Sequence, residues 1–121
     1  MTARQRPIAG KPSVVRRAAV AGRLTLRSST VRALRAGAID KGDPLATAET
    51  AGLLAMKRTS ELIPHCHIVP LTASSVAISV DARGVTVRAE AESFGATGVE
   101  MEALVGASVA LLTVWDMVKY L

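Results

Sequence analysis

The sequence predicts an α+β fold in which a mainly antiparallel sheet packs on helices. Two neighbouring segments alternate apolar and polar residues around a turn, as the strands of a β-hairpin do. Other segments carry helix-start residues ahead of apolar positions at helical spacing. With 121 residues and the order strand, helix, helix, hairpin, helix, the chain suits a single domain.

A strand and a short helix are expected first. Residues 14–26 place β-branched and apolar side chains between arginines, which favours a strand. Ser28 and Ser29 are suitable caps for a helix over 30–36, and Gly37 is suited to end it.

A second helix is predicted from Pro44 to about Leu62. Asp43 is placed to cap it, and proline is tolerated at the first helical position because its missing N–H has no helical partner there. The helix stops before Pro64. Mostly small residues recur along it at roughly helical spacing and favour close packing: Leu45, Ala48, Gly52, Ala55 and Met56.

A hairpin and a long last helix complete the domain. Residues 76–80 and 85–87 alternate on either side of a turn at 81–84. Thr97 and Glu100 have the spacing of a capping box ahead of the last helix. This helix is apolar nearly all round over 103–114, which predicts burial on more than one side and hence a subunit interface. The apolar run is shorter than the about 20 residues that span a membrane, so we expect no membrane insertion.

Composition limits the compartment and the core. The only aromatic residues are Phe94, Trp115 and Tyr120, so the core must consist of Val, Leu, Ile and especially Ala. A single cysteine, Cys66, excludes an intrachain disulfide and fits a reducing compartment. With no apolar signal segment near the start, we expect a cytoplasmic protein.

Positive charge is concentrated in the first third of the chain. The first 35 residues contain nine basic residues and no acidic one, which indicates an anionic partner. No helix-turn-helix, zinc-finger or aromatic stacking pattern supports nucleic acid, so a solvated basic face or a small phosphorylated ligand remains. Residues 1–12 show no period and contain Pro7 and Pro12; we expect a flexible arm there and one domain over 13–121.

Two groups of residues are candidates for chemistry. Lys57 and Arg58 either terminate the second helix or bind an anion. The His65-Cys66-His67 segment lacks the second pair of ligands that a zinc site needs, so we expect no metal there. On the last helix, Asp116 and Lys119 are neighbours, either as a surface ion pair or as a pair suited to proton transfer.

The last helix also carries Glu100 and Glu102 at its other end. Glu102 and Asp116 lie within about 40° of the same helix face, but the helical rise separates them by about 21 Å. One small substrate cannot touch both in one chain. We therefore predict that, if both serve one site, a second subunit supplies one of them.

Three motifs resemble the molybdenum cofactor biosynthesis protein C family, the cyclic pyranopterin monophosphate synthases. They lie in order between about Arg16 and Lys119. The motifs are Lys41-Gly42-Asp43 together with residues 55–64, Thr97-Gly98-Val99-Glu100-Met101-Glu102-Ala103-Leu104, and Trp115-Asp116-Met117-Val118-Lys119. The chain departs from the family where Ile68 follows Cys66-His67 in place of proline.

The resemblance implies a ferredoxin-like fold in a homo-hexamer built as a trimer of dimers, with the active site at a dimer interface. It implies a phosphorylated pterin precursor as substrate: a cyclised dihydro-GTP intermediate is converted to cyclic pyranopterin monophosphate, and pyrophosphate is released. No cofactor is certain, and Mg²⁺ is left open as a companion of the substrate phosphates. Neither nucleic acid nor membrane is expected as a partner.

The resemblance also implies roles for individual residues. Asp116 and Lys119 match the catalytic pair, with Lys119 as general acid or base. The matching substrate-binding positions are Arg16, Lys41, Lys57, His67, Glu100 and Glu102.

The family's glycine- and lysine-rich C-terminal tail, which carries an active-site lysine, has no counterpart up to Leu121. Two hypotheses follow. One is an active synthase. The other is a catalytically impaired, truncated relative that acts as an oligomeric nucleotide- or partner-binding protein.

Overall fold

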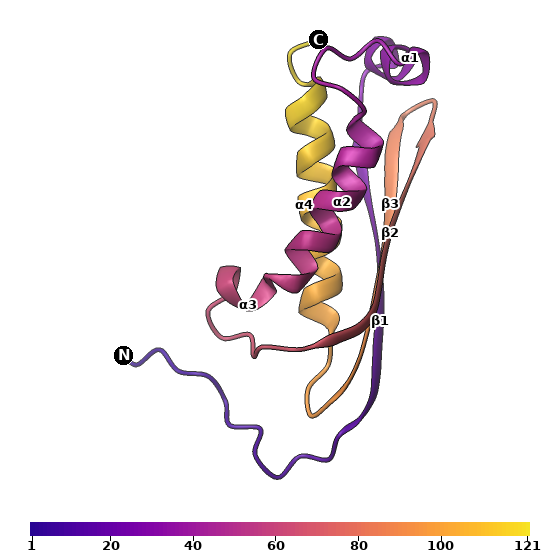
Figure 1. Ribbon diagram of the computed structural model, residues 1–121. Coiled ribbons are helices and arrows are strands. Elements are labelled where there is room, and N and C mark those ends of the chain that lie inside the picture. The colour runs from indigo at the N-terminus through magenta and orange to yellow at the C-terminus, as the bar shows by residue number, and fades with distance from the viewer.

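The computed structural model describes all 121 residues as an α+β fold with a three-stranded antiparallel sheet and four helices (Figure 1). The elements follow in the order β1 (Val14–Thr25), α1 (Ser28–Ala36), α2 (Pro44–Lys57), α3 (Thr59–Leu62), β2 (Leu71–Asp81), β3 (Gly84–Gly95) and α4 (Glu100–Val118). The strand order is β1-β3-β2. The α+β class and the antiparallel sheet predicted from the sequence are confirmed.

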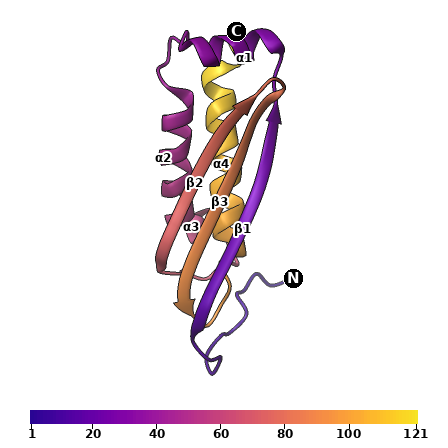
Figure 2. The same ribbon diagram turned by 90° about the vertical axis from the view of Figure 1, so that its right-hand side faces the viewer.

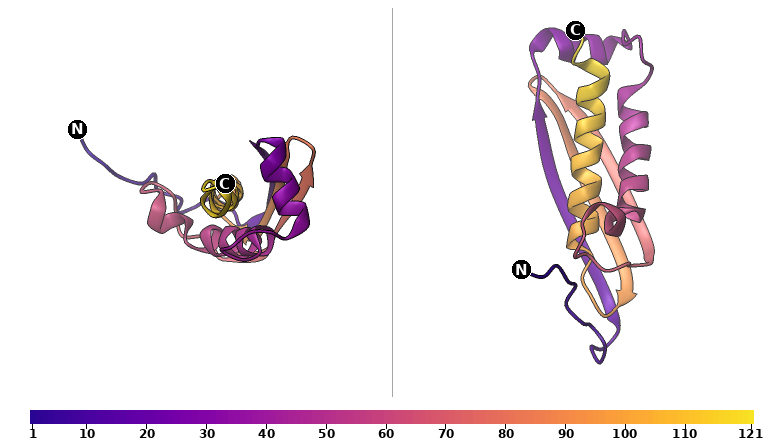
Figure 3. Two further views of the ribbon diagram at one scale, coloured as in Figure 1. Left: turned by 90° about the horizontal axis from the view of Figure 1, so that it is seen from above. Right: turned by 90° about the vertical axis from the view of Figure 1, so that its left-hand side faces the viewer.

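The molecule has two layers. Helices α2 and α4 lie side by side across one face of the sheet, and the other face is left uncovered (Figures 1 and 2). Helix α1 crosses the end of the molecule where the β2–β3 turn and the C-terminus lie (Figure 3). The opposite end gathers the start of β1, the end of β3 and the start of α4 (Figure 1). These two ends matter because the candidate site residues divide between them.

Small side chains fill the space between the layers. The inward positions of β3 are Val85, Val87, Ala89 and Ala91, and none is more than 4% exposed. At the crossing of α2 and α4, a Cβ atom added to Gly52 would lie 2.9 Å from the backbone oxygen of Gly106. The helix backbones therefore touch there, as the small residues of the second helix predicted.

The predicted starts of two helices are wrong. Ser28 and Ser29 do not cap α1 but form its first residues, and Arg27 at the cap position makes no side-chain cap bond. Gly37 ends this helix as predicted, with a φ of 68°. The predicted capping box does not form, because the buried Val99 occupies the cap position of α4 and makes no side-chain cap bond. Thr97 consequently lies two residues too early to cap the helix.

The second helix is also interrupted. Asp43 caps α2 and Pro44 is its first residue, as predicted, but α2 ends at Lys57 and α3 follows after Arg58. The buried Thr59 hydroxyl donates to the carbonyls of Ala55 and Met56, both at 3.0 Å. These carbonyls sit at the end of the helix, and a side-chain donor there favours a break.

Helix α4 is long and apolar enough to pass a length-and-composition test for a membrane span. Half of that stretch is buried against the rest of the chain. The core helix of a soluble protein passes the same test, so the result is weak evidence for a membrane.

Candidate functional site

Three predicted site residues meet at the C-terminal end of α4. The Lys119 Nζ atom lies 3.1 Å from Oδ1 of Asp116. The Lys41 Nζ atom donates to the backbone oxygen of Asp116 at 2.9 Å and lies 3.8 Å from its Oδ2. All three side chains are about half exposed or more. A single carboxylate thus faces two ammonium groups at the surface, and the cluster carries net positive charge.

A hydrogen bond from the loop between α1 and α2 helps to place Lys41 in this cluster. The backbone N–H of Asp40 donates to the hydroxyl of Tyr120 at 2.9 Å. Asp43, two residues beyond Lys41, accepts from the N–H groups of Leu45 and Ala46 and fixes the other end of the loop. Tyr120 was not among the predicted site residues, because nothing in the sequence signals a contact between residues 80 positions apart.

The two lysines act on the titration of Asp116. The hydrogen bond from Lys119, and then the charge of Lys41, hold the pKa of the Asp116 carboxyl below its usual range. The carboxylate therefore stays ionised at neutral pH and can orient an ammonium group or a substrate.

A buried pair lies near the other end of α4. Glu102 is only 2% exposed, although it belongs to the first turn of the helix. Its Oε2 accepts from the thiol of Cys66 at 3.5 Å, and its Oε1 is buried without a hydrogen-bond partner. Burial, and then the charge of Glu102, raise the pKa of the Cys66 thiol to about 11. Cys66 was not among the predicted site residues either.

The remaining predicted residues belong to this same end of the molecule. Glu100 is exposed on the first turn of α4, and Lys57 is the last residue of α2. His67 is half-buried in the segment between α3 and β2. Arg16 lies near the start of β1, where its Nε donates to the backbone oxygen of Gly95 at 3.2 Å. This end therefore holds the basic side chains of Arg16 and Lys57, of which Lys57 is exposed.

One chain does not bring the two groups together. Helix α4 is continuous from Glu100 to Val118, so its rise keeps Glu102 and Asp116 about 21 Å apart. The geometry on which the shared-site prediction depends is therefore present, and the shared site itself stays a prediction.

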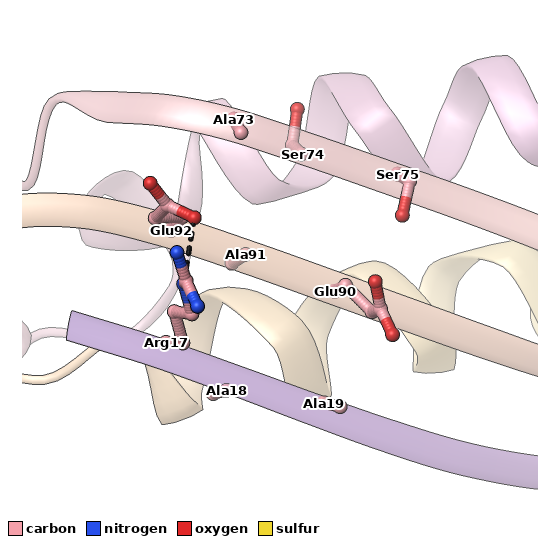
Figure 4. A pocket seen from close by; sticks show the side chains of 9 residues that line it. All are labelled: Arg17, Ala18, Ala19, Ala73, Ser74, Ser75, Glu90, Ala91 and Glu92. Carbon is pink, nitrogen blue, oxygen red and sulfur yellow. Dashed lines mark hydrogen bonds and ion pairs between the residues drawn. The ribbon is translucent and has the colours of Figure 1, made fainter.

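Two surface hollows lie away from both groups. One, of about 580 Å³, lies on the open face of the sheet, where Arg17 and Glu92 form an ion pair at 2.8 Å (Figure 4). The other, of about 410 Å³, lies beside α4 and is lined by residues that include Leu24, Leu112 and Trp115. Neither of these two hollows contains a predicted site residue. No group of three His, Cys, Asp or Glu side chains is arranged to hold a metal ion.

Comparison with known proteins agrees with the motifs. A family model described as the MoaC family matches residues 6–121. A probable cyclic pyranopterin monophosphate synthase of Methanococcoides burtonii is 52% identical over 112 residues, which cover 93% of this chain and 70% of that protein. A protein of the same name from Pyrococcus abyssi is 48% identical with the same coverage.

A relative from Methanothermobacter thermautotrophicus is named a probable cyclic pyranopterin monophosphate synthase accessory protein and is 48% identical, again over 93% of this chain and 70% of that protein. The match of the family model covers nearly the whole chain, and these relatives share about half of its residues. The chain belongs to the MoaC family.

Proposed function

We propose that this chain is a cyclic pyranopterin monophosphate synthase of molybdenum cofactor biosynthesis. It converts a cyclised dihydro-GTP intermediate to cyclic pyranopterin monophosphate and releases pyrophosphate, which makes it a lyase, and it works in the cytoplasm. The observation that carries the proposal is the cluster of Lys41, Asp116 and Lys119 in a chain of this family.

Each side chain of that cluster has a role in the proposal. Lys119 is the general acid or base, and the ionised Asp116 orients its ammonium group. Lys41 adds positive charge toward the triphosphate of the substrate, as Arg16 and Lys57 do from the other end of the molecule. His67 and Glu100 complete the binding groups. We place Glu102 in the same set because of the motif it shares with Glu100, although its side chain is buried. Mg²⁺ is proposed only as a companion of the substrate phosphates.

The exposed face of α4 supports a site shared between subunits. The exposed residues of this face form one stripe, and its apolar members are 37–63% exposed: Met101, Leu104, Leu112 and Trp115. Ser108 lies at its centre, seven residues from Met101 and from Trp115 and four from Leu104 and from Leu112. A stripe that is symmetric about its midpoint suits an isologous contact, in which two copies of α4 pack antiparallel.

Such a pairing joins the two groups of site residues. With Ser108 on the two-fold axis, Glu100 of one chain lies at the same height along the helix pair as Asp116 of the partner subunit, because both lie eight residues from the centre. The positive cluster of one copy then lies at the same end of the helix pair as the acidic first turn of the other copy. We propose that this dimer is the unit of a hexamer built as a trimer of dimers. The strand order β1-β3-β2, with helices on one face, supports a ferredoxin-like arrangement for each subunit.

Turnover of the cyclised GTP intermediate tests the function. Lys119→Arg keeps a positive charge but cannot release a proton at usable pH, so we expect a loss of turnover of about a hundredfold or more with nucleotide binding largely kept. Lys11→Arg, outside both groups, is the matched control. Binding without turnover in the parent protein would favour the non-catalytic alternative, and near-parental turnover of Lys119→Arg would exclude proton transfer by Lys119.

A further inference from the structure

The buried end of α4 contains a carboxylate with a single hydrogen bond. Glu102 is 2% exposed, its Oε1 has no partner, and its Oε2 accepts only from the Cys66 thiol. A buried acceptor without a donor is costly, and a low local dielectric strengthens the bond that is made. The Cys66 thiol is therefore the one group in the chain that compensates the burial of this carboxylate.

Cys66 belongs to a segment that has no regular structure of its own. Residues 63–70 connect α3 to β2, and neither a helix nor a strand holds them. Cys66 takes part in four hydrogen bonds. Its N–H donates to the oxygen of Ile63 at 3.0 Å, and its oxygen accepts from the side-chain amide of Gln5 at 2.9 Å. Its thiol has two acceptors, Oε2 of Glu102 at 3.5 Å and the backbone oxygen of His67 at 3.6 Å. Of these four hydrogen bonds, only the one to Glu102 connects the segment to a helix of the layer, α4.

The next residue along the chain is His67, which the proposed function places in the substrate site. A histidine on an irregular segment loses its orientation easily unless its neighbours are fixed. The thiol keeps its proton at neutral pH because its pKa is raised to about 11. It is thus a permanent hydrogen-bond donor and a poor nucleophile.

We infer that Cys66 is a positioning residue, whose hydrogen bond to the buried Glu102 holds the segment that presents His67 to the substrate. This inference rests on the proposed function for the role of His67, but the position of the ring can be measured without it. The chain contains two histidines, and the exposed His65 is an internal control for the half-buried His67.

The first experiment follows both imidazole rings by NMR in the full chain, with parent, Cys66→Ser and Cys66→Ala compared. Serine keeps a donor of similar size, so its His67 signal should match that of the parent. Alanine removes the donor, so the His67 signal should broaden or divide while that of His65 stays unchanged. An unchanged His67 signal in a folded Cys66→Ala variant would overturn the inference. If Cys66→Ala does not fold, the Cys66→Ser variant decides: a His67 signal that differs from that of the parent would also overturn the inference.

The second experiment connects the position of the ring to binding, with GTP as the probe. Cys66→Ala should weaken GTP binding about tenfold, and Cys66→Ser by less than about threefold. In a His67→Ala background, Cys66→Ala should add less than about a twofold change, because two residues that act through one group are not additive. Additive losses would contradict action through His67. A parent chain that binds no GTP would count against the proposed function, while the NMR comparison would still decide the role of Cys66.

Discussion

At the scale of single residues, the sequence predicted the surface pair better than the buried one. Asp116 and Lys119 meet as their spacing indicated, since neighbours on a helix are fixed by its geometry. The contact between Cys66 and Glu102 joins residues 36 positions apart. No local pattern encodes such a contact, and Glu102 on a first helical turn gave no sign that it would be buried.

The titration of Asp116 is the first prediction at this scale. Its pKa in the folded chain is below the usual value for aspartate because Lys119 and then Lys41 stabilise the carboxylate. Because the pKa of Asp116 is lower in the folded chain than in the unfolded chain, the ion pair stabilises the fold fully at any pH above the usual aspartate pKa. This stabilisation is lost as the pH falls through the lower pKa of the folded chain.

Carboxyl-carbon NMR over an acid titration measures this pKa. The midpoint of Asp116 should lie below the usual value for an aspartate side chain, and Lys119→Met should move it upward. No movement in Lys119→Met would show that Lys119 does not hold the carboxylate.

At the scale of elements, the segment order and the hairpin could be predicted, and the helix ends could not. Alternation and turn residues are local signals, so β2 and β3 were recognisable from the sequence. The break after Lys57 and the start of α4 depend on how deeply Thr59 and Val99 are buried. Burial is settled by the assembled layers, which is why the capping box was a reasonable but wrong prediction.

The crossing of α2 and α4 supports a stability prediction. A Cβ atom at position 52 would approach the Gly106 oxygen to 2.9 Å and the Cγ2 atom of Val76 to 3.0 Å. Alanine improves helix propensity by about 1 kcal/mol. A backbone oxygen cannot move aside as a side chain can, however, so the crowding should prevail. We expect Gly52→Ala to destabilise the chain by about 1–3 kcal/mol.

Urea unfolding measures this difference. Thr50→Ala, on the exposed side of the same helix, is the control and should change stability little. A Gly52→Ala variant as stable as the parent would show that the two helices can separate without cost.

At the scale of the whole molecule, the division of the candidate site residues between two ends was predictable from helix geometry alone. A fixed rise per residue separates Glu102 from Asp116 in any continuous helix. The stripe on α4 was only partly foreseen. The sequence showed a helix apolar nearly all round, and only the packed structure shows which face stays uncovered.

The exposed apolar stripe on α4 predicts that a charge introduced into it should weaken subunit assembly. Leu112 is 63% exposed in the single chain, so Leu112→Glu should leave the fold intact and weaken assembly through a buried, unpaired carboxylate. Light scattering in dilute solution should report a hexamer, or at least a dimer, for the parent and a smaller species for the variant. A well-folded parent monomer would contradict the two-fold pairing and the shared site together.

Trp115 has a use that follows from its place on this stripe. It is the only tryptophan of the chain, and it is 47% exposed beside the hollow against β1 rather than in the core. Its fluorescence therefore reports on its surroundings at the outer face of α4, where a second helix would exclude water. The wavelength of its emission, followed on dilution, would distinguish separation of subunits from unfolding without any added label.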